Sequence, residues 1–362
     1  MHVLHVVGAR PNFMKVAPVL RALRQQPGVR QTLLHTGQHY DANMSDIFFQ
    51  QLGLPAPDIF LGVGSGSHAQ QTAQVLVKFE EAVQQARPDW VLVYGDVNST
   101  MAAALVCAKL RIRVAHVEAG LRSFDRDMPE EINRLVTDQV ADLLLTPSAD
   151  GDANLLKEGI PAERIRRVGN VMIDTLVRLL AQARLPDVPL KPPFALVTLH
   201  RPSNVDDPQQ LRQILETLIG LSAECQMVFP VHPRTRSRIA DLGSTFPGGE
   251  RCLLLEPLGY VECLALQNHA AAIVTDSGGI QEESTYLGVP CLTLRENTER
   301  PITVTEGTNT LIGSDMRLLQ SELKQILRGQ GKRGRKPDLW DGRAGERIAA
   351  VLTGAAELRA AA

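Results

Sequence analysis

Acidic residues gather in the segment HVEAGLRSFDRDMPEEINR, residues 116–134. Glu118 directly follows an apolar run that is typical of a buried strand. By the two-residue period of a strand, His116 and Glu118 share one face. Glu118 is therefore either a catalytic carboxylate or an acid held by a neighbouring cation such as Arg122.

The proline in the same segment, Pro129, predicts a helix start with acids in its first turn. Negative charge is favoured at that end of a helix, so capping explains one or two of Asp127, Glu130 and Glu131. Glu130 lies outside the predicted buried stripe, and Arg134 is its i+4 partner. The residues of that stripe are Ile132, Leu135, Val136, Val140 and Leu143.

The motif GARPNFMK, residues 8–15, suits an anion. Gly8 permits a tight turn after a strand, and Arg10 and Lys15 follow it at a predicted helix N-terminus. An ordinary turn with solvated cations explains the motif equally well. It matches neither a Walker loop nor GxGxxG, so P-loop hydrolysis and dinucleotide binding lose support.

The motif TDSGGIQEE, residues 275–283, is the stronger candidate for a phosphate site. Ser277, Gly278 and Gly279 let backbone N–H groups approach an anion at a helix start. Capping alone would need only Asp276 or Ser277. Glu283, about one turn further on, suits the two hydroxyls of a ribose, or it is simply a favourable charge near the helix start.

Three more polar residues follow apolar runs. Asp96 in YGDVNST is a catalytic candidate or a helix cap, and His200 and His232 end two successive predicted strands. A structural histidine is the commoner interpretation for either one alone. A metal site that uses His116, Glu118 and Asp96 is possible by residue type, but HExxH and cysteine-ligand spacings are absent, and we expect no metal.

Short β-branched runs alternate with helix-period segments, which predicts the α/β class with parallel sheets. The first set of predicted strands covers residues 3–7, 31–36, 90–95, 113–118, 142–147 and, as a further candidate, 166–170. The second set covers 194–200, 226–232, 252–257, 271–277 and 290–295. We expect two Rossmann-like domains, at 1–183 and 194–340, joined by a proline-rich linker at 184–193 and followed by a C-terminal helical segment at 341–362.

Ligands of open α/β sheets bind beyond the carboxyl ends of the strands. The polar motifs all fall there, so two domains facing one cleft would bring them together. The converging set is Arg10, Lys15, His39, Asp96, Glu118, His200, His232, Ser277, Glu283 and Arg300.

Composition limits the partners. The net charge of −2 and the pI near 6.5 provide no basic field for nucleic acid or acidic lipid. The five cysteines are scattered without a CxxC pair, which fits a reducing, cytoplasmic environment. No basic leader or membrane span of roughly 20 apolar residues is evident, so we expect a cytoplasmic protein without a membrane partner.

Taken together, the motifs resemble the non-hydrolysing UDP-N-acetylglucosamine 2-epimerases. The resemblance runs from residue 1 to about residue 350. It depends on the joint occurrence of GARPNFMK, HVEAGLRS, PEEINR, GN at 169–170, PVHPR, TDSGGIQEE and TERP. It implies a glycosyltransferase-B-type fold, a homodimer, and a C-terminal helix that crosses back onto the first domain.

The resemblance also implies an activity: reversible conversion of UDP-GlcNAc to UDP-ManNAc, without a cofactor, through 2-acetamidoglucal and UDP. The matching catalytic positions are Asp96, Glu118, Glu130 and His200, and Arg10, Lys15, Arg300 and the N–H groups near Ser277 would stabilise the departing diphosphate. Positions that match an allosteric UDP-GlcNAc site in some relatives are Gln38, His39, Arg201 and His232.

One departure stands at HRPSN, where Pro202 and Ser203 replace the Arg-Glu of many family members. Three alternatives remain: a hydrolysing UDP-GlcNAc 2-epimerase, a B-type UDP-sugar glycosyltransferase with an acceptor groove, and a nucleotide-sugar sensor without chemistry.

Overall fold

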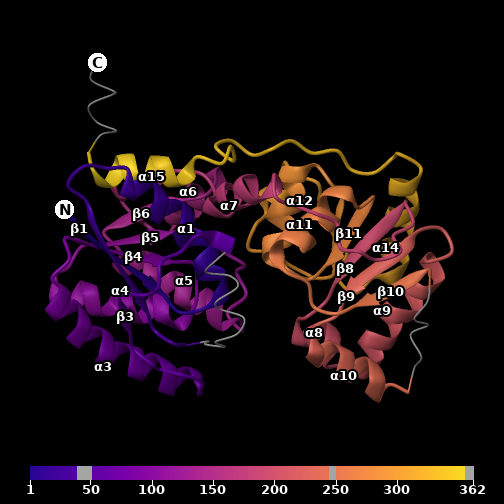
Figure 1. Ribbon diagram of the computed structural model, residues 1–362, viewed down its shortest axis with the longest axis horizontal. Helices are drawn as coiled ribbons and strands as arrows, with labels where there is room; N and C mark the ends of the chain where they lie inside the picture. Colours follow the sequence, from indigo (N-terminus) through magenta and orange to yellow (C-terminus); the bar gives the residue numbers. More distant parts are fainter. Residues whose placement is uncertain (39–50, 244–249, 355–362) are drawn as a thin grey trace. The chain divides into compact units, whose positions relative to one another are not determined.

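The computed structural model describes residues 1–38, 51–243 and 250–354 (Figure 1). The chain forms two compact units. Unit 1 comprises Met1–Thr175 and Asp338–Ala362, and unit 2 comprises Leu176–Pro337. The division falls inside helix α7 (Val171–Leu180), before the proline-rich stretch at 184–193.

Unit 1 is built on a seven-stranded parallel sheet with the order β3-β2-β1-β4-β5-β6-β7. Its strands are β1 (His2–Val7), β2 (Arg30–His35), β3 (Ile59–Phe60), β4 (Trp90–Tyr94), β5 (Val114–Val117), β6 (Leu143–Thr146) and β7 (Ile165–Arg167). Its helices are α1 (Arg10–Arg24), α3 (His68–Ala86), α4 (Asn98–Leu110), α5 (Pro129–Val140), α6 (Ala149–Lys157), the short 3-10 helix η1 (Ala162–Arg164) and α15 (Ala344–Leu352).

The central strands of unit 1 are buried on both faces, which is why β4 is a continuous apolar run and β1 is apolar apart from His2 and His5. On one face, Val75, Phe79 and Val83 of α3 join the small residues of α4 in a common core with Leu4 and Val6 of β1. Helix α15 lies on the opposite side of the unit from α3 (Figure 1). It packs on α1, and its Ala344 and Gly345 N–H groups donate to Asp174.

Unit 2 is built on a six-stranded parallel sheet with the order β10-β9-β8-β11-β12-β13. Its strands are β8 (Phe194–Thr198), β9 (Gln226–Pro230), β10 (Cys252–Leu255), β11 (Ala272–Thr275), β12 (Cys291–Thr293) and β13 (Asn309–Leu311). Its helices are α8 (Pro202–Val205), α9 (Pro208–Leu221), α10 (Pro233–Asp241), α11 (Tyr260–His269), α12 (Gly278–Leu287), α13 (Ile302–Thr305) and α14 (Met316–Leu327).

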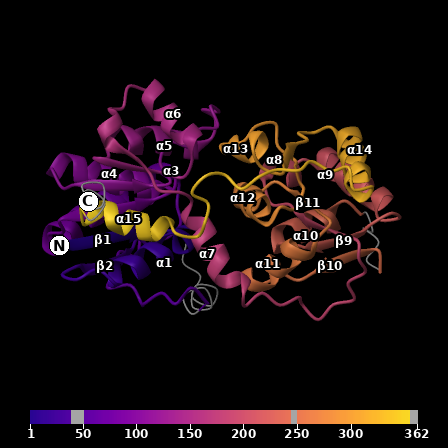
Figure 2. The same ribbon diagram turned by 90° about the horizontal axis from the view of Figure 1, so that it is seen from above.

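The second sheet is also covered on both faces. Leucines and isoleucines of α9 and α14, which lie side by side in Figure 2, form one core cluster with Val197 and Phe229. Leu266 of α11 and residues around α12 form another cluster with Leu196 and Val228. The predicted α/β class with two parallel sheets is confirmed, and every strand predicted from the sequence is present. The short edge strands β3 and β13 were not predicted.

Both sheets share one topological feature. The strand order reverses between β1 and β4 in unit 1 and between β8 and β11 in unit 2. Ligands of doubly wound sheets bind beyond the carboxyl ends of the strands at such a switch point. The loops after β1, β4, β8 and β11 carry Gly8, Asp96, His200 and Asp276.

The predicted apolar stripe on α5 is wrong in this structure. Its five members, Ile132, Leu135, Val136, Val140 and Leu143, are only half-buried, and Leu143 belongs to β6. The buried residues of α5 are instead the polar Glu131, Asn133, Arg134, Thr137 and Asp138. These polar side chains can be buried because this face of the helix packs against charged and polar groups at the strand ends, which supply hydrogen bonds and ion pairs.

Candidate functional site

In unit 1 the candidate site is centred on Gly95, directly after β4. A Cβ on Gly95 would lie 2.5 Å from Lys15 Nζ and 3.2 Å from Glu118 Oε2, so the absent side chain leaves room for both groups. Gly95 also has φ +64°, which favours glycine. Lys15 and Glu118 form an ion pair, and both are almost fully buried.

The backbone at Glu118 is strained, with φ +74°. A non-glycine residue in this region costs about 1–3 kcal/mol and persists where the surroundings fix it. Here the N–H groups of Glu118 and Ala119 both donate to the carbonyl of Leu145, at 3.0 and 3.2 Å. The chain thus directs the Glu118 carboxylate towards Lys15 at some cost in backbone energy.

Two expectations for Glu118 need correction. Strand β5 ends at Val117, so strand alternation does not extend to Glu118 and does not place it with His116. The cation beside Glu118 is Lys15, not Arg122, whose guanidinium binds Asp138 and Glu158 at 2.7 Å each.

His116 belongs to a buried charge network. Its Nδ1 lies 2.6 Å from Asp138 Oδ1, and its Nε2 lies 2.8 Å from the Gly95 carbonyl oxygen. Both of these neighbouring atoms are oxygens that can accept a hydrogen bond. Burial opposes the charge on Asp138, but His116 and Arg122 outweigh it and hold the pKa of Asp138 below its usual range. This network fixes the turn that leads to Asp96.

Asp96 is held by Arg134. The guanidinium donates to Asp96 Oδ2 from Nε at 3.1 Å and from Nη2 at 2.7 Å, and to Glu131 Oε2 from Nη1 at 2.5 Å. Glu131 also accepts from the N–H groups of Ser123 and Phe124, at 3.0 Å each. Glu131 is therefore an anchor for the loop after β5.

Glu130 is the exposed acid of this helix start. Its predicted i+4 pairing with Arg134 is wrong, because the fork of Arg134 is occupied by Asp96 and Glu131. Among the residues that the structure describes, Glu130 forms no ion pair, and its side chain is exposed to solvent.

The start of α1 is satisfied internally. The N–H groups of Gly8 and Ala9 donate to Asn12 Oδ1 at 3.0 Å, and Asn12 Nδ2 donates to the Tyr94 carbonyl. The exposed N–H groups expected here for a phosphate are therefore already bonded. Arg10 begins the helix, but its side chain lies outside the described residues.

Gln38 is also engaged within unit 1. Its Oε1 accepts from the Ser99 N–H at 3.2 Å and from Ser99 Oγ at 2.7 Å, which caps the start of α4. His39, the neighbouring candidate, lies outside the described residues.

In unit 2, Asp276 joins the ends of β8 and β11. It is fully buried and accepts from the N–H groups of His200 and Arg201, at 3.0 and 2.9 Å, and from Asn204 Nδ2 at 3.1 Å. His200 Nδ1 lies 2.7 Å from its other oxygen, while more than half of the His200 side chain is exposed. Pro202 occupies the first position of α8, where its missing N–H leaves no bond unmade.

The start of α12 combines glycines with a cation. Ser277 is the N-cap but makes no capping bond with its side chain. A Cβ on Gly278 would lie 2.7 Å from Arg300 Nη1, whereas one on Gly279 would meet open space. The Arg300 guanidinium therefore lies against the first turn, held by Glu299 and by Glu282 at 2.9 Å.

Glu283 lies further into the same helix and is buried. Its two oxygens accept from Tyr260 Oη at 2.8 Å and from Gln267 Nε2 at 2.6 Å. Burial raises the pKa of Glu283, and these two hydrogen bonds only partly oppose the shift.

The two remaining candidates lie on the loops after β8 and β9. His232 is exposed and caps α10, since its Nδ1 accepts from the Arg234 N–H at 3.3 Å. Arg201 is half-buried, and its Nε donates to the Asp276 carbonyl at 3.1 Å.

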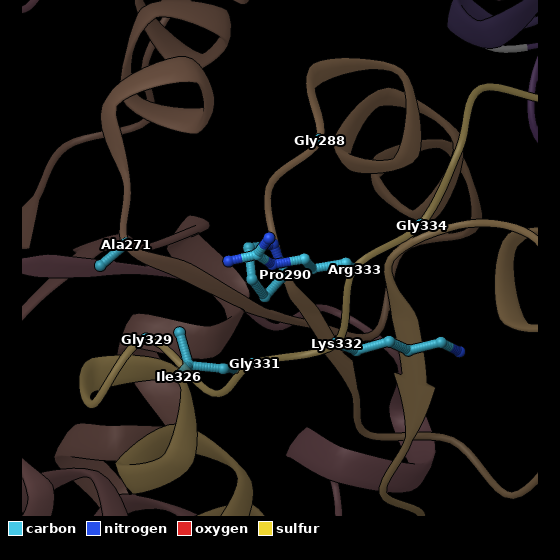
Figure 3. Close-up of a pocket in the computed structure, with 9 residues that line it drawn as sticks. All are labelled: Ala271, Gly288, Pro290, Ile326, Gly329, Gly331, Lys332, Arg333 and Gly334. Carbon is cyan, nitrogen blue, oxygen red and sulfur yellow. The ribbon is translucent and has the colours of Figure 1, made fainter.

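A cavity of 370 Å³ lies at the other end of the second sheet, beside Ala271 and Pro290, which precede β11 and β12. Figure 3 shows Arg333 reaching across Pro290, while Lys332 points away from it. The Lys332 ammonium donates to the carbonyls of Val304 and Asn309. Helices α12 and α14 end here, and their carbonyl ends disfavour an anion.

The described residues hold no group of three or more His, Cys, Asp or Glu side chains arranged for a metal ion. In the same part of the chain, no helix is both long and apolar enough to cross a bilayer.

Sequence reasoning missed three positioning residues: Arg134 as the partner of Asp96, Asp138 beneath His116, and Asp276 beside His200. Asp276 is separated from the glycine pair of TDSGG by Ser277, and the sequence interpretation treats it only as a helix cap. The available signal was that Asp276 ends one central strand while His200 ends another.

Known proteins resemble this chain over almost its whole length. A profile of the UDP-N-acetylglucosamine 2-epimerase family matches residues 21–353. The UDP-N-acetylglucosamine 2-epimerase of Methanocaldococcus jannaschii is 41% identical over 360 residues, which cover 96% of this chain and 98% of that protein. The UDP-2,3-diacetamido-2,3-dideoxy-D-glucuronate 2-epimerase of Pseudomonas aeruginosa is 43% identical over 318 residues, 87% of this chain and 89% of that protein.

Solved structures agree. The crystal structure of the M. jannaschii enzyme in complex with UDP-GlcNAc and UDP matches with a TM-score of 0.88 and 41% identity, over 98% of this chain and 100% of that one. A UDP-glucosyltransferase from Polygonum tinctorium, 14% identical, matches with a TM-score of 0.59 over 97% and 98% of the two chains, which supports the fold alone.

Proposed function

Because the chain belongs to the UDP-N-acetylglucosamine 2-epimerase family, a family of isomerases, we propose that it interconverts UDP-GlcNAc and UDP-ManNAc. The reaction breaks the C2–H and C1–O bonds and forms 2-acetamidoglucal and UDP. The glucal then takes a proton on the other face of C2 while UDP re-adds at C1. Atoms and charge balance without an oxidant or reductant, so no redox cofactor is required.

The observation that carries this proposal is that Glu118 and Asp96, two carboxylates each paired with its own cation, both lie near the switch point of unit 1. Both carboxylates lie beyond the carboxyl ends of central strands, and each has a buried cation as its partner, Lys15 or Arg134. Proton transfer by a positioned group contributes about 10²–10⁴-fold.

Epimerisation needs a proton removed from one face of C2 and supplied to the other. We assign these two roles to Glu118 and Glu130, because Glu118 is fixed and buried while Glu130 is exposed at the start of α5. Asp96 and His200 take part in proton transfer or orient the glucal. Lys15, proposed from the sequence as a diphosphate ligand, also holds the Glu118 carboxylate in position through their ion pair.

The departing UDP carries the negative charge that develops as the C1–O bond breaks. The first turn of α12 supports a diphosphate site, because free space at Gly279 and the guanidinium of Arg300 against Gly278 place amide dipoles and a cation together. Ser277 and Arg10 complete the proposed set. Glu283 keeps one lone pair on each oxygen beyond its bonds to Tyr260 and Gln267, and we assign these to the ribose.

We extend the proposal to a regulatory UDP-GlcNAc that contacts Arg201 and His232 on the loops of unit 2. Gln38 is a weaker candidate, because its carbonyl oxygen already caps α4. We also propose that the enzyme is a homodimer; its molar mass in solution, measured by light scattering, tests this directly.

A second substrate is favoured by a specific observation. The P. aeruginosa relative, whose name specifies a 2,3-diacetamido-2,3-dideoxy-D-glucuronate, is as similar to this chain as the UDP-GlcNAc enzyme is. That sugar undergoes the same inversion at C2 and differs at C3 and C6. The proposed catalytic groups would serve both sugars, so the choice depends on contacts away from C2.

Anomeric ¹H NMR of the two UDP-sugars, each incubated separately with the enzyme, tests the function. Persistent growth of the UDP-ManNAc signal from UDP-GlcNAc supports the proposal. Conversion of the diacetamido uronate alone would move the assignment to that sugar. Stoichiometric release of free ManNAc with UDP would replace epimerisation by hydrolysis, and turnover only with an added acceptor would indicate a glycosyltransferase.

A further inference from the structure

Asp276 makes four hydrogen bonds to one short segment of unit 2. The residue is fully buried directly after β11. It accepts from the backbone N–H groups of His200 and Arg201, from the Asn204 side chain, and from His200 Nδ1 at 2.7 Å. This set is more than a helix cap needs, because it also engages the one imidazole at the end of β8.

The charge of Asp276 determines the state of that imidazole. Burial works against ionisation, but the hydrogen bonds from His200, Arg201 and Asn204 outweigh it, so the pKa of Asp276 lies below its usual range. A carboxylate can only accept hydrogen bonds, and therefore His200 Nδ1 must carry a proton. In the neutral ring, the lone pair is then on Nε2.

The exposure of the ring agrees with this assignment. The His200 side chain is 55% exposed although its Nδ1 contacts a residue with no exposure at all. The ring is therefore anchored at one nitrogen and open at the other. Which nitrogen of a histidine is protonated is set by the partner of the other nitrogen.

We propose that Asp276 is a positioning residue that holds His200 with Nδ1 protonated and Nε2 directed outward as the atom that accepts a proton. When Nε2 takes a proton, the ring becomes an imidazolium and its new charge lies beside the Asp276 carboxylate. When the proton leaves, the same neutral tautomer is restored. The tautomer follows from the contacts of unit 2 alone, whereas the transfer of a substrate proton at Nε2 rests on the proposed function.

Asp276 also links His200 to the proposed diphosphate site. Its carbonyl oxygen accepts from Arg201 Nε at 3.1 Å, and the next residue, Ser277, is the N-cap of α12. The imidazole and the first turn of α12 are thus fixed to the same residue. This link keeps the distance between the leaving-group site and the proton acceptor constant within unit 2.

A purely structural role for Asp276 makes a different prediction. Three of its four hydrogen bonds come from two backbone N–H groups and the Asn204 amide, and they would form whichever nitrogen of the His200 ring carried the proton. Asp276→Asn separates the two roles, because the amide oxygen still accepts from backbone N–H groups while the amide nitrogen can only donate. Facing that donor, His200 Nδ1 must become an acceptor, and the neutral ring moves its proton to Nε2.

The test is ¹⁵N NMR of the full-length protein labelled at histidine, with the His200 signals assigned by their loss in His200→Gln. In spectra recorded at a pH at which the ring is neutral, the wild type should show Nδ1 protonated, and Asp276→Asn should show the opposite tautomer. We expect kcat to fall by about 10²–10³ in Asp276→Asn with KM changed less than about threefold. Asn204→Ala, which removes one bond to Asp276 without touching the ring, should keep the wild-type tautomer.

The outcomes separate the two claims. A wild-type ring protonated on Nε2, or an unchanged tautomer in a folded Asp276→Asn variant, overturns the positioning role. If Asp276→Asn does not fold, the wild-type spectrum and Asn204→Ala still decide. If the tautomers are as predicted but His200→Gln keeps full activity, the positioning stands and the catalytic assignment of His200 is wrong.

Discussion

Replacing Arg134 by Met should destabilise unit 1 by an amount that the contacts of Arg134 define. The guanidinium is 2% exposed and is forked between Asp96 and Glu131. Removing one partner of a buried pair costs about 3–5 kcal/mol, because the other charge is left uncompensated. Glu131 keeps the N–H donors of Ser123 and Phe124, which argues for the lower end, about 3 kcal/mol.

Asp96 adds little to this loss of stability, because its side chain is 26% exposed and water can solvate it. A unit of roughly 200 residues loses about 2–4 °C of Tm per kcal/mol, so we expect a decrease of about 6–12 °C. Activity should fall as well, since Asp96 loses the group that orients it.

Thermal unfolding followed by far-UV circular dichroism at pH 7 measures the effect of Arg134→Met. Arg24→Met, an exposed change on α1, is the matched control and should stay within about 2 °C of wild type. Arg134→Lys keeps the charge without the fork and should fall in between. Adding Glu131→Gln to Arg134→Met should recover part of the loss. An Arg134→Met variant as stable as Arg24→Met would refute the reasoning.

Three further predictions concern the same unit. In a double-mutant cycle, Lys15→Met and Glu118→Gln should each lower the free energy of unfolding. The loss in the double variant should be about 1–3 kcal/mol smaller than the sum of the losses in the two single variants, because the two side chains form an ion pair. Losses that simply add would show that the ion pair does not couple the two residues. Gly95→Ala should lower both Tm and kcat, because its Cβ would meet Lys15 Nζ and φ is +64°; a variant with wild-type turnover would contradict that packing. Burial raises the pKa of Asp174 to about 6, so the native state binds this proton more tightly than the unfolded chain does. The free energy of unfolding of the wild type should therefore fall by up to about 3 kcal/mol as pH rises from about 4 to about 6, and then level off. The Tm of the wild type should fall relative to that of Asp174→Asn over the same pH range. A Tm difference independent of pH in chemical denaturation and heating series would exclude that titration.

The sequence predicted the strands well because parallel central strands need apolar side chains on both faces. β4 is such a run, with four of its five residues buried, and β1 is buried at all six positions. The two-residue strand β3 was missed for the opposite reason, since Ile59–Phe60 is too short to show a period.

The candidate residues could be selected from the sequence, but their contacts could not. Residue type and position after a strand sufficed to select Asp96, Glu118 and His200, because the carboxyl ends of parallel strands are where polar groups gather. Their partners could not be chosen in this way. Arg134 is 38 residues from Asp96 in the sequence and three from Glu131, and only the packing of α5 shows that it serves both.

The α5 stripe failed for a related physical reason. Periodicity assumes that the apolar face of a helix is the buried one. In α5 the buried face carries Glu131, Arg134 and Asp138, each satisfied by a partner from another element or loop. Helical periodicity cannot detect such partners, so the prediction assigned the buried face to the wrong side of the helix.

The most direct test of the proposed chemistry is the fate of the C2 hydrogen. UDP-GlcNAc incubated with the enzyme in D₂O should acquire deuterium at C2 in both the remaining substrate and the UDP-ManNAc formed, as seen by ¹H NMR and mass spectrometry. The reason is that the proton removed by a side chain exchanges with solvent before another is returned. Epimer formed with its original C2 hydrogen intact would contradict the elimination and re-addition proposed here.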